Sequence, residues 1–284
     1  MDWVMHSTPL YKVTKRTFDN SDRLVIAFDN WQQIPDIEKQ CFGEFYLSSR
    51  KINHITIKCG QNSWFQDEEF AEIIKSIQEA AAGSRMIGYG SSMGAYAAIS
   101  FYEKLGFSDA IAFCPQYSID SSKVPFEPRW RKEAANLNFR HDFVSSQPAI
   151  RKATVIYDPL HRWDSAHCGL IARYHPAVHF SRLPFSGHGP VEHLRRLGLL
   201  PEFVDSLLMN RFDPAKHRER IKATRASNGH YWVNMSSLNM RKRPKLALKA
   251  ALNATKCLNA GELEKMQYEK VLKFLGIDEG DLFA

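Results

Sequence analysis

Six short apolar runs, separated by segments of helical character, constrain the fold of this 284-residue chain more than any other feature. Runs that alternate with helices are typical of a mostly parallel sheet with helices on both faces, so we predict an α/β fold. One intervening helix is clear at 67–81, where apolar residues recur at i, i+3, i+4 and i+7. The six runs are 23–28, 54–58, 85–89, 109–114, 153–157 and 177–183.

The charge balance changes near the point where the apolar runs stop. Residues 1–209 contain 23 Lys and Arg against 23 Asp and Glu, whereas residues 210–284 contain 15 against 8, so the net charge of +7 lies entirely in the second segment. We therefore divide the chain into an α/β domain, 1–209, and a basic helical C-terminal region, 210–284. The basic region either meets an acidic protein partner or is a solvated helical surface. Its expected helices are 230–240, 243–258 and 261–276.

The cysteine and hydropathy patterns exclude several classes of protein. The five cysteines are scattered without a C-x-x-C pair, which argues against a disulfide framework and a zinc knuckle. No apolar run approaches the roughly 18 residues that span a bilayer, and the first residues do not resemble a secretion signal. The basic region lacks the interleaved aromatic residues of a single-strand nucleic-acid binder. We expect a cytoplasmic protein with no membrane span and no nucleic-acid partner.

A long segment, residues 115–152, separates the fourth run from the fifth. It contains four prolines and little helical periodicity. An excursion of this length at the carboxyl end of a strand is typical of a lid or specificity element in an open α/β sheet. Its cations Arg129, Arg131 and Lys132 either hold a negative group of a substrate or form a solvated face.

The third run leads into the sequence G-S-S-M-G at 90–94, for which three interpretations are open. A dinucleotide fingerprint fits poorly, because the glycine spacing is one residue too long, and no lysine follows the last glycine as in a phosphate loop. The glycines of a strand-to-helix turn can also be purely structural, and G-x-S-x-G occurs by chance in roughly one chain in ten of this size. The third interpretation is a nucleophile elbow, in which Ser92 occupies a strained turn between Gly90 and Gly94.

A nucleophilic serine needs a histidine base and a carboxylate that orients the base, in the chain order serine, acid, histidine on this architecture. His188 lies in the loop S-G-H-G after the last run and is the histidine in the expected position. Two acids follow the fifth run. We favour Asp164 because it lies further out on its loop, and Asp158 is the alternative; Asp120, after the fourth run, is a third candidate. Asp158, which precedes a proline, also fits a turn, and Asp164 also fits a helix N-cap.

An oxyanion hole needs two backbone N–H groups that point at the developing negative charge. Met93, directly after the serine, would supply one of them. Asn30 or Trp31, in the loop after the first run, would supply the other.

Four histidines near Asp164 raise the possibility of a metal site. Two of them are four residues apart, but a proline and a β-like run between them make a shared helical face improbable. We therefore expect no metal and no other cofactor. The four are His161, His167, His175 and His179.

Three segments, G-Y-G-S-S-M-G-A-Y-A-A, V-I-Y-D-P-L-H-R-W-D and L-P-F-S-G-H-G, together resemble the α/β-hydrolase superfamily. The resemblance covers residues 22–208 and looks like a short form that begins near the family's third strand. It implies cleavage of an ester, thioester or related acyl bond through a serine-bound acyl intermediate, without a metal or organic cofactor. Carried over, Ser92 attacks, His188 transfers the proton, and Asp164 or Asp158 orients His188.

The leading expectation is therefore a serine hydrolase of the esterase or thioesterase type, acting on a small-molecule or acyl-carrying substrate. Two alternatives stay open. One is a catalytically inactive α/β-hydrolase-like binding or scaffold protein that acts through its helical tail. The other is an acyltransferase that uses the same triad, which the sequence cannot separate from a hydrolase.

Overall fold

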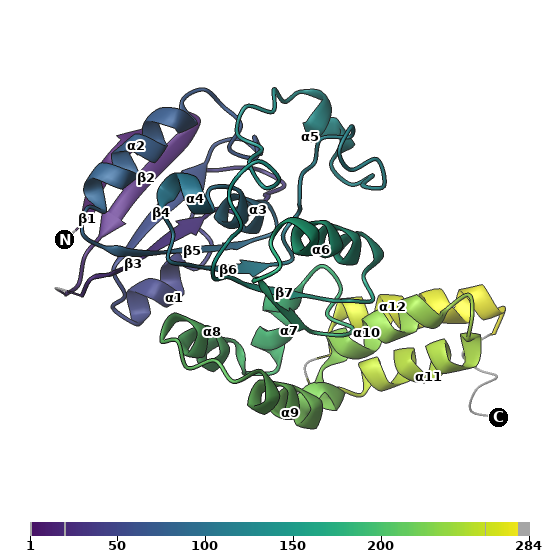
Figure 1. The fold of residues 1–284 in the computed structure, drawn as a ribbon. Coiled ribbons are helices and arrows are strands. Elements are labelled where there is room, and N and C mark those ends of the chain that lie inside the picture. Colours follow the sequence, from purple (N-terminus) through teal and green to yellow (C-terminus); the bar gives the residue numbers. More distant parts are fainter. Residues whose placement is uncertain (1, 20, 259, 278–284) are drawn as a thin grey trace. The chain divides into compact units, whose positions relative to one another are not determined.

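The computed structural model describes residues 2–19, 21–258 and 260–277. The chain forms two compact units, Met1–Arg182 and Leu183–Ala284 (Figure 1). The first unit ends with the last strand of the sheet, and the second is helical. The domain boundary at residue 209, which follows from the distribution of charge, differs from this boundary at residue 182 and stays a prediction.

One eight-stranded sheet organises the first unit, in the order β1-β2-β4-β3-β5-β6-β7-β8. At one edge of the sheet β1 and β2 pair antiparallel, β2 pairs antiparallel with β4, and the remaining pairs are parallel. The strands are β1 (Asp2–Ser7), β2 (Tyr11–Arg16), β3 (Arg23–Phe28), β4 (His54–Cys59), β5 (Arg85–Ser91), β6 (Asp109–Phe113), β7 (Thr154–Tyr157) and β8 (His179–Arg182).

All six predicted strands are present, which confirms the α/β class, but two strands precede them. The expectation of a short form whose sheet begins at residue 23 is therefore corrected. Strand β1 lies at the sheet edge with mostly exposed side chains, and β2 alternates buried and half-buried positions. Neither strand contains an apolar run, because only part of each is buried, so a search for such runs misses this hairpin.

Helices cover both faces of the sheet. In Figure 1, α2, α3, α4 and α6 lie on one face and α1 lies on the other. The predicted stripe of α2 is confirmed as core, since Phe70, Ile73 and Ile77 are buried. Residues 115–152 contain one short helix, α5, among the described residues. The helices are α1 (Glu44–Ser49), α2 (Phe70–Ala80), α3 (Met93–Ser100), α4 (Tyr102–Leu105), α5 (Arg131–Ala135) and α6 (Arg162–Tyr174).

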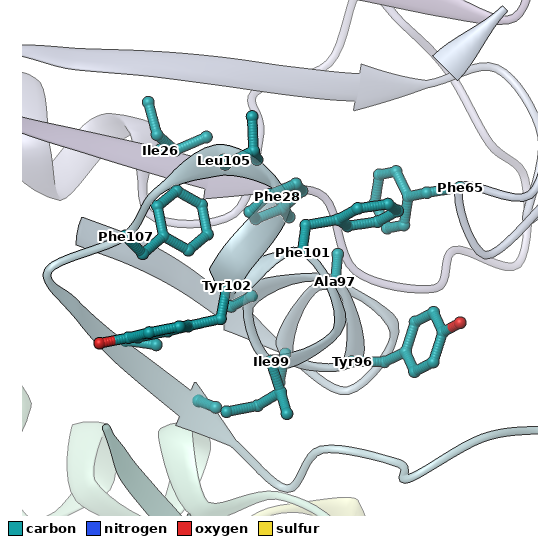
Figure 2. Close-up of a cluster of buried hydrophobic side chains, with 14 of the residues drawn as sticks. Ile26, Phe28, Phe65, Tyr96, Ala97, Ile99, Phe101, Tyr102, Leu105 and Phe107 are labelled. Carbon is teal, nitrogen blue, oxygen red and sulfur yellow. The ribbon is translucent and has the colours of Figure 1, made fainter. Parts of the chain in front are cut away.

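An aromatic cluster joins β3 to α3 and its following turn (Figure 2). The Phe28 ring, at the end of β3, lies 5.5 Å from the Phe65 ring, 6.3 Å from Phe101 and 6.2 Å from Phe107. All four side chains are buried. Fully burying a phenylalanine contributes about 1.5–3 kcal/mol, so this cluster fixes α3 firmly against β3.

The second unit consists of helices, and its three predicted C-terminal helices are confirmed. A small core of Ala247, Ala251, Tyr268, Val271 and Leu272 joins α11 to α12, and the alanines let the helices approach closely. Among the described residues, no helix is both long enough and apolar enough to cross a membrane. The helices are α7 (Pro190–Arg196), α8 (Leu200–Leu208), α9 (Pro214–Thr224), α10 (Gly229–Asn239), α11 (Pro244–Thr255) and α12 (Glu262–Leu275).

Candidate active site

Ser92 occupies a strained turn between β5 and α3. Its backbone has φ 51° and ψ −115°, a conformation that an L-residue adopts only when its surroundings enforce it. A Cβ on Gly90 would lie 2.2 Å from the carbonyl carbon and oxygen of Gly94, and a Cβ on Gly94 would lie 2.4 Å from the Phe28 carbonyl oxygen. Both glycines are thus required by the close passage of strand and helix, as the elbow interpretation predicts.

We expect Gly94→Ala to lower the free energy of unfolding by about 3 kcal/mol, the upper end of the usual cost of overpacking. The added methyl group would meet backbone atoms of Phe28, which cannot rotate away. Thermal unfolding measures the effect.

Gly169→Ala is the matched control for this prediction. Gly169 is an exposed residue of α6, and a Cβ there meets nothing within 4 Å. Because alanine favours a helix over glycine by about 1 kcal/mol, this variant is expected to be slightly more stable than the wild type. Equal midpoints of thermal unfolding for Gly94→Ala and Gly169→Ala would contradict the close contact between Gly94 and the backbone of Phe28.

The loop after β3 lies against the start of α3. The proposed oxyanion donors are Met93, at the start of this helix, and Asn30 or Trp31, in this loop. A Cβ on Gly94 would lie 2.8 Å from the Asp29 carbonyl oxygen. The Asn30 N–H donates to Asp29 Oδ1 at 3.2 Å. Within the described part of the chain, the backbone N–H groups of Met93 and Trp31 have no hydrogen-bond partner. Of the two loop candidates, Trp31 therefore has the N–H that remains available to a ligand.

Asp29 is a buried carboxylate in this loop that the sequence analysis missed. Its Oδ2 accepts hydrogen bonds from Gln32 Nε2 at 2.7 Å and from the Cys59 N–H at 3.4 Å. Burial raises the pKa of Asp29 to about 6, although these hydrogen bonds act in the opposite direction. The carboxylate holds the loop after β3 in place. The signal was present in the sequence, since Asp29 directly follows an apolar run, as Asp158 does.

Asp164 lies in the first turn of α6 and is fully buried. Its Oδ1 accepts a hydrogen bond from Arg129 Nη2 at 2.9 Å, and its Oδ2 lies 3.0 Å from His161 Nδ1. The helix cap is His161, which accepts from the Asp164 N–H, so the capping interpretation of Asp164 is wrong. The ion pair with Arg129 holds the carboxylate in one orientation.

Arg129 joins the segment 115–152 to α6. Besides Asp164, its guanidinium binds Glu127 Oε2 at 2.6 Å, and it lies 5.3 Å from the Trp163 ring centre. Glu127 also accepts from His167 Nε2 at 2.9 Å. Burial alone would raise the pKa of Glu127, but the hydrogen bonds from His167 and Arg129 outweigh it and lower the pKa to about 2.

These contacts separate Arg129 from Arg131 and Lys132, the three cations that were expected to hold a negative group of a substrate or to form a solvated face. Arg129 is largely buried and already pairs with two carboxylates, so its guanidinium is committed to the fold. Arg131 and Lys132 are exposed, as a solvated face requires.

The two other candidate acids take part in local turns. Asp158 is buried at the end of β7, and its Oδ1 accepts from the Leu160 N–H at 2.9 Å. Asp120 Oδ1 accepts from the N–H and the hydroxyl of Ser122, at 2.8 and 2.7 Å.

Two of the four clustered histidines, His167 and His175, form hydrogen bonds through both ring nitrogens. His175 Nδ1 accepts from the Ile150 N–H at 3.2 Å, and its Nε2 donates to the Val144 carbonyl at 2.6 Å. His167 Nδ1 accepts from the Tyr117 N–H at 3.1 Å. Both rings tie residues 115–152 to α6 and its end.

His188 lies in the second unit, six residues after the end of β8. The residue before it, Gly187, has φ 61°, and His188 itself is half-buried. Ser92, Asp158 and Asp164 belong to the first unit and follow the carboxyl ends of β5 and β7. Because β5, β6, β7 and β8 are parallel neighbours, the segments that follow them leave from one edge of the sheet.

No protein-family model and no curated protein matches this sequence. Solved structures do match. A chain of the Glycosylation Associate Protein (Gap123) complex from Streptococcus agalactiae has a TM-score of 0.52 at 14 % identity, covering 71 % of this chain and 45 % of that one. The capsule O-acetyltransferase of Neisseria meningitidis serogroup A has a TM-score of 0.53 at 9 % identity, covering 72 % and 93 %.

The acylaminoacyl peptidase of Pyrococcus horikoshii has a TM-score of 0.51 at 12 % identity, and the match covers 76 % of this chain and 43 % of that one. This chain has the α/β-hydrolase fold. The same fold is found in that peptidase and in the capsule O-acetyltransferase. The matched part spans less than half of the streptococcal and Pyrococcus chains.

Proposed function

We propose that this protein is a serine hydrolase that cleaves an ester or thioester through an acyl-serine intermediate. The observation that carries the proposal is the strained backbone of Ser92, held between two obligatory glycines at the start of α3. Such strain persists only where the surrounding structure enforces it, and it clusters at active sites. The unpartnered N–H of Met93, directly after the serine, supports the same conclusion.

In the proposed reaction, the Ser92 hydroxyl oxygen attacks the acyl carbonyl carbon while His188 accepts the hydroxyl proton. The N–H groups of Met93 and Trp31 donate to the oxyanion that forms, and one such donor is worth about 3 kcal/mol in the transition state. His188 then protonates the leaving group, and the acyl group stays on Ser92. Water, deprotonated by His188, attacks the acyl-serine, releases the acid and restores the serine.

We assign the orienting carboxylate to Asp164. Its side chain is buried and accepts a hydrogen bond from Arg129, which supports a fixed orientation. Asp158 Oδ1, by comparison, already accepts the N–H of its own turn.

Trapping the acyl-enzyme tests the proposal. With p-nitrophenyl acetate, we expect an initial burst of about one p-nitrophenol per protein, because acylation usually precedes a slower deacylation. Mass spectrometry of the quenched protein should find one acetyl group on the peptide that contains Ser92. Acetyl groups spread over surface lysines, without a burst, would contradict the proposal.

Acyl transfer is the second candidate function, and the likeness to the capsule O-acetyltransferase supports it. In this case an alcohol takes the place of water as the attacking nucleophile. Adding acceptor alcohols to the same reaction distinguishes the two: an acetylated alcohol that exceeds free acetate supports a transferase, and free acetate alone supports a hydrolase.

A further inference from the structure

We propose that helix α10 of the C-terminal region is a positioning element for His188, and that Asn234 is the residue through which it acts. The inference rests on the proposed function, in which His188 is the base. It gives the C-terminal helices a part in the reaction, although none of their side chains is proposed to touch the substrate. All of the contacts involved lie within the second unit.

On the N-terminal side of His188, α10 holds a strained residue. Phe185 has φ 65°, a conformation that a bulky residue adopts only under constraint. Asn234 Nδ2 donates to the Phe185 carbonyl oxygen at 3.1 Å. The Phe185 ring also packs edge-on against Tyr231, with ring centres 5.3 Å apart. Two residues of one helix therefore fix the backbone three positions before His188.

The two neighbours of His188 in the chain also pack against α10. A Cβ on Gly187 would lie 3.1 Å from Asn234 Oδ1, and a Cβ on Gly189 would lie 3.4 Å from His230 Cε1. Asn234 Nδ2 makes a further hydrogen bond, to His230 Nε2 at 3.2 Å. The Asn234 amide is thus the point where the loop residues before His188 meet the helix.

On the C-terminal side of His188, the start of α10 holds helix α7. Asn228 caps α10 by accepting the His230 N–H at 3.0 Å, and its Nδ2 donates to the His193 carbonyl oxygen at 3.2 Å. Arg196 of α7 binds the buried Glu264 of α12 at 2.7 Å. His188 therefore lies in a loop that is held on both sides by the C-terminal helices.

A matched pair of variants in the full-length chain tests this inference. In Asn234→Asp the shape is kept but the N–H donors are lost. We expect kcat for p-nitrophenyl acetate to fall by up to about 100-fold with KM nearly unchanged, because a displaced base affects the chemical step and not substrate binding. Asn239→Ala is the control: Asn239 lies on the same helix, and among the described residues its Nδ2 bonds only to the Met235 carbonyl of that helix. We expect its kcat to equal that of the wild type.

Amide hydrogen exchange supplies a readout that does not depend on activity. Exchange over residues 184–189 should accelerate in Asn234→Asp and stay at the wild-type rate in Asn239→Ala. Unchanged exchange and unchanged kcat in Asn234→Asp would overturn the inference.

His188→Ala, measured in parallel, separates this inference from the proposed function. If His188→Ala keeps wild-type activity, the proposed function fails and the positioning role fails with it. If His188→Ala is inactive while Asn234→Asp is fully active, the proposed function stands and this inference alone is overturned.

Discussion

Ser92→Ala is expected to lose all labelling by a fluorophosphonate probe and to lower kcat by roughly 10⁶-fold, as the loss of a triad serine does elsewhere. The probe forms a bond to an activated serine oxygen, so no other residue type in the turn can replace it. Gel-based labelling and steady-state kinetics with an ester measure the two effects. The fold should be retained, because Ser92 is half-buried and alanine adds no atom.

Ser91→Ala is the matched control, since Ser91 is the adjacent residue at the end of β5. It should keep both the label and most of the turnover. Labelling that survives in Ser92→Ala but disappears in Ser91→Ala would remove Ser92 from the reaction.

Asp164→Asn is expected to lower kcat by about 10⁴-fold, because an amide in place of the orienting carboxylate favours the wrong histidine tautomer. The substitution keeps the size of the side chain. Asp158→Asn should have little effect, since its amide oxygen can still accept the Leu160 N–H. Steady-state kinetics of the two variants measure the difference, and a large loss in Asp158→Asn alone would transfer the role to Asp158.

Glu127→Gln controls for the ion pairs that Asp164→Asn also breaks. Both substitutions remove one of the two carboxylates that share Arg129, and removing a buried ionic partner costs up to about 3–5 kcal/mol. Thermal unfolding should therefore show similar losses of stability for both variants. Only Asp164→Asn should lose kcat.

Local patterns in the sequence were sufficient for the six strands β3 to β8 and for the turn at Ser92. Strands β3 to β7 are buried along most of their length, so their apolar runs are continuous and easy to recognise, whereas the edge strand β8 is half-buried or exposed. The glycines at 90 and 94 are required by contacts with residues of the same turn and of β3. The G-x-S-x-G motif has a glycine at each of these two positions, so the requirement can be recognised from the sequence.

Long-range pairing explains what the sequence could not predict. Arg129 was expected to face solvent or a substrate, but its partner Asp164 lies 35 positions away. Asn234 and Phe185 are 49 positions apart, and nothing near either residue indicates the other. The hairpin of β1 and β2 was missed because its residues are only partly buried. An acidic partner for residues 210–284 and a cytoplasmic location stay predictions.

The hydrogen bond from Asn234 to Phe185 has a consequence for biosynthesis. Domains generally fold from the N-terminus as the chain leaves the ribosome, so the sheet and the Ser92 turn can form while α10 is not yet made. The loop of His188 gains its support only after residue 234 has emerged. We therefore expect a nascent chain that already carries its nucleophile but cannot use it, and that becomes competent only after helix α10 has been translated and has left the ribosome.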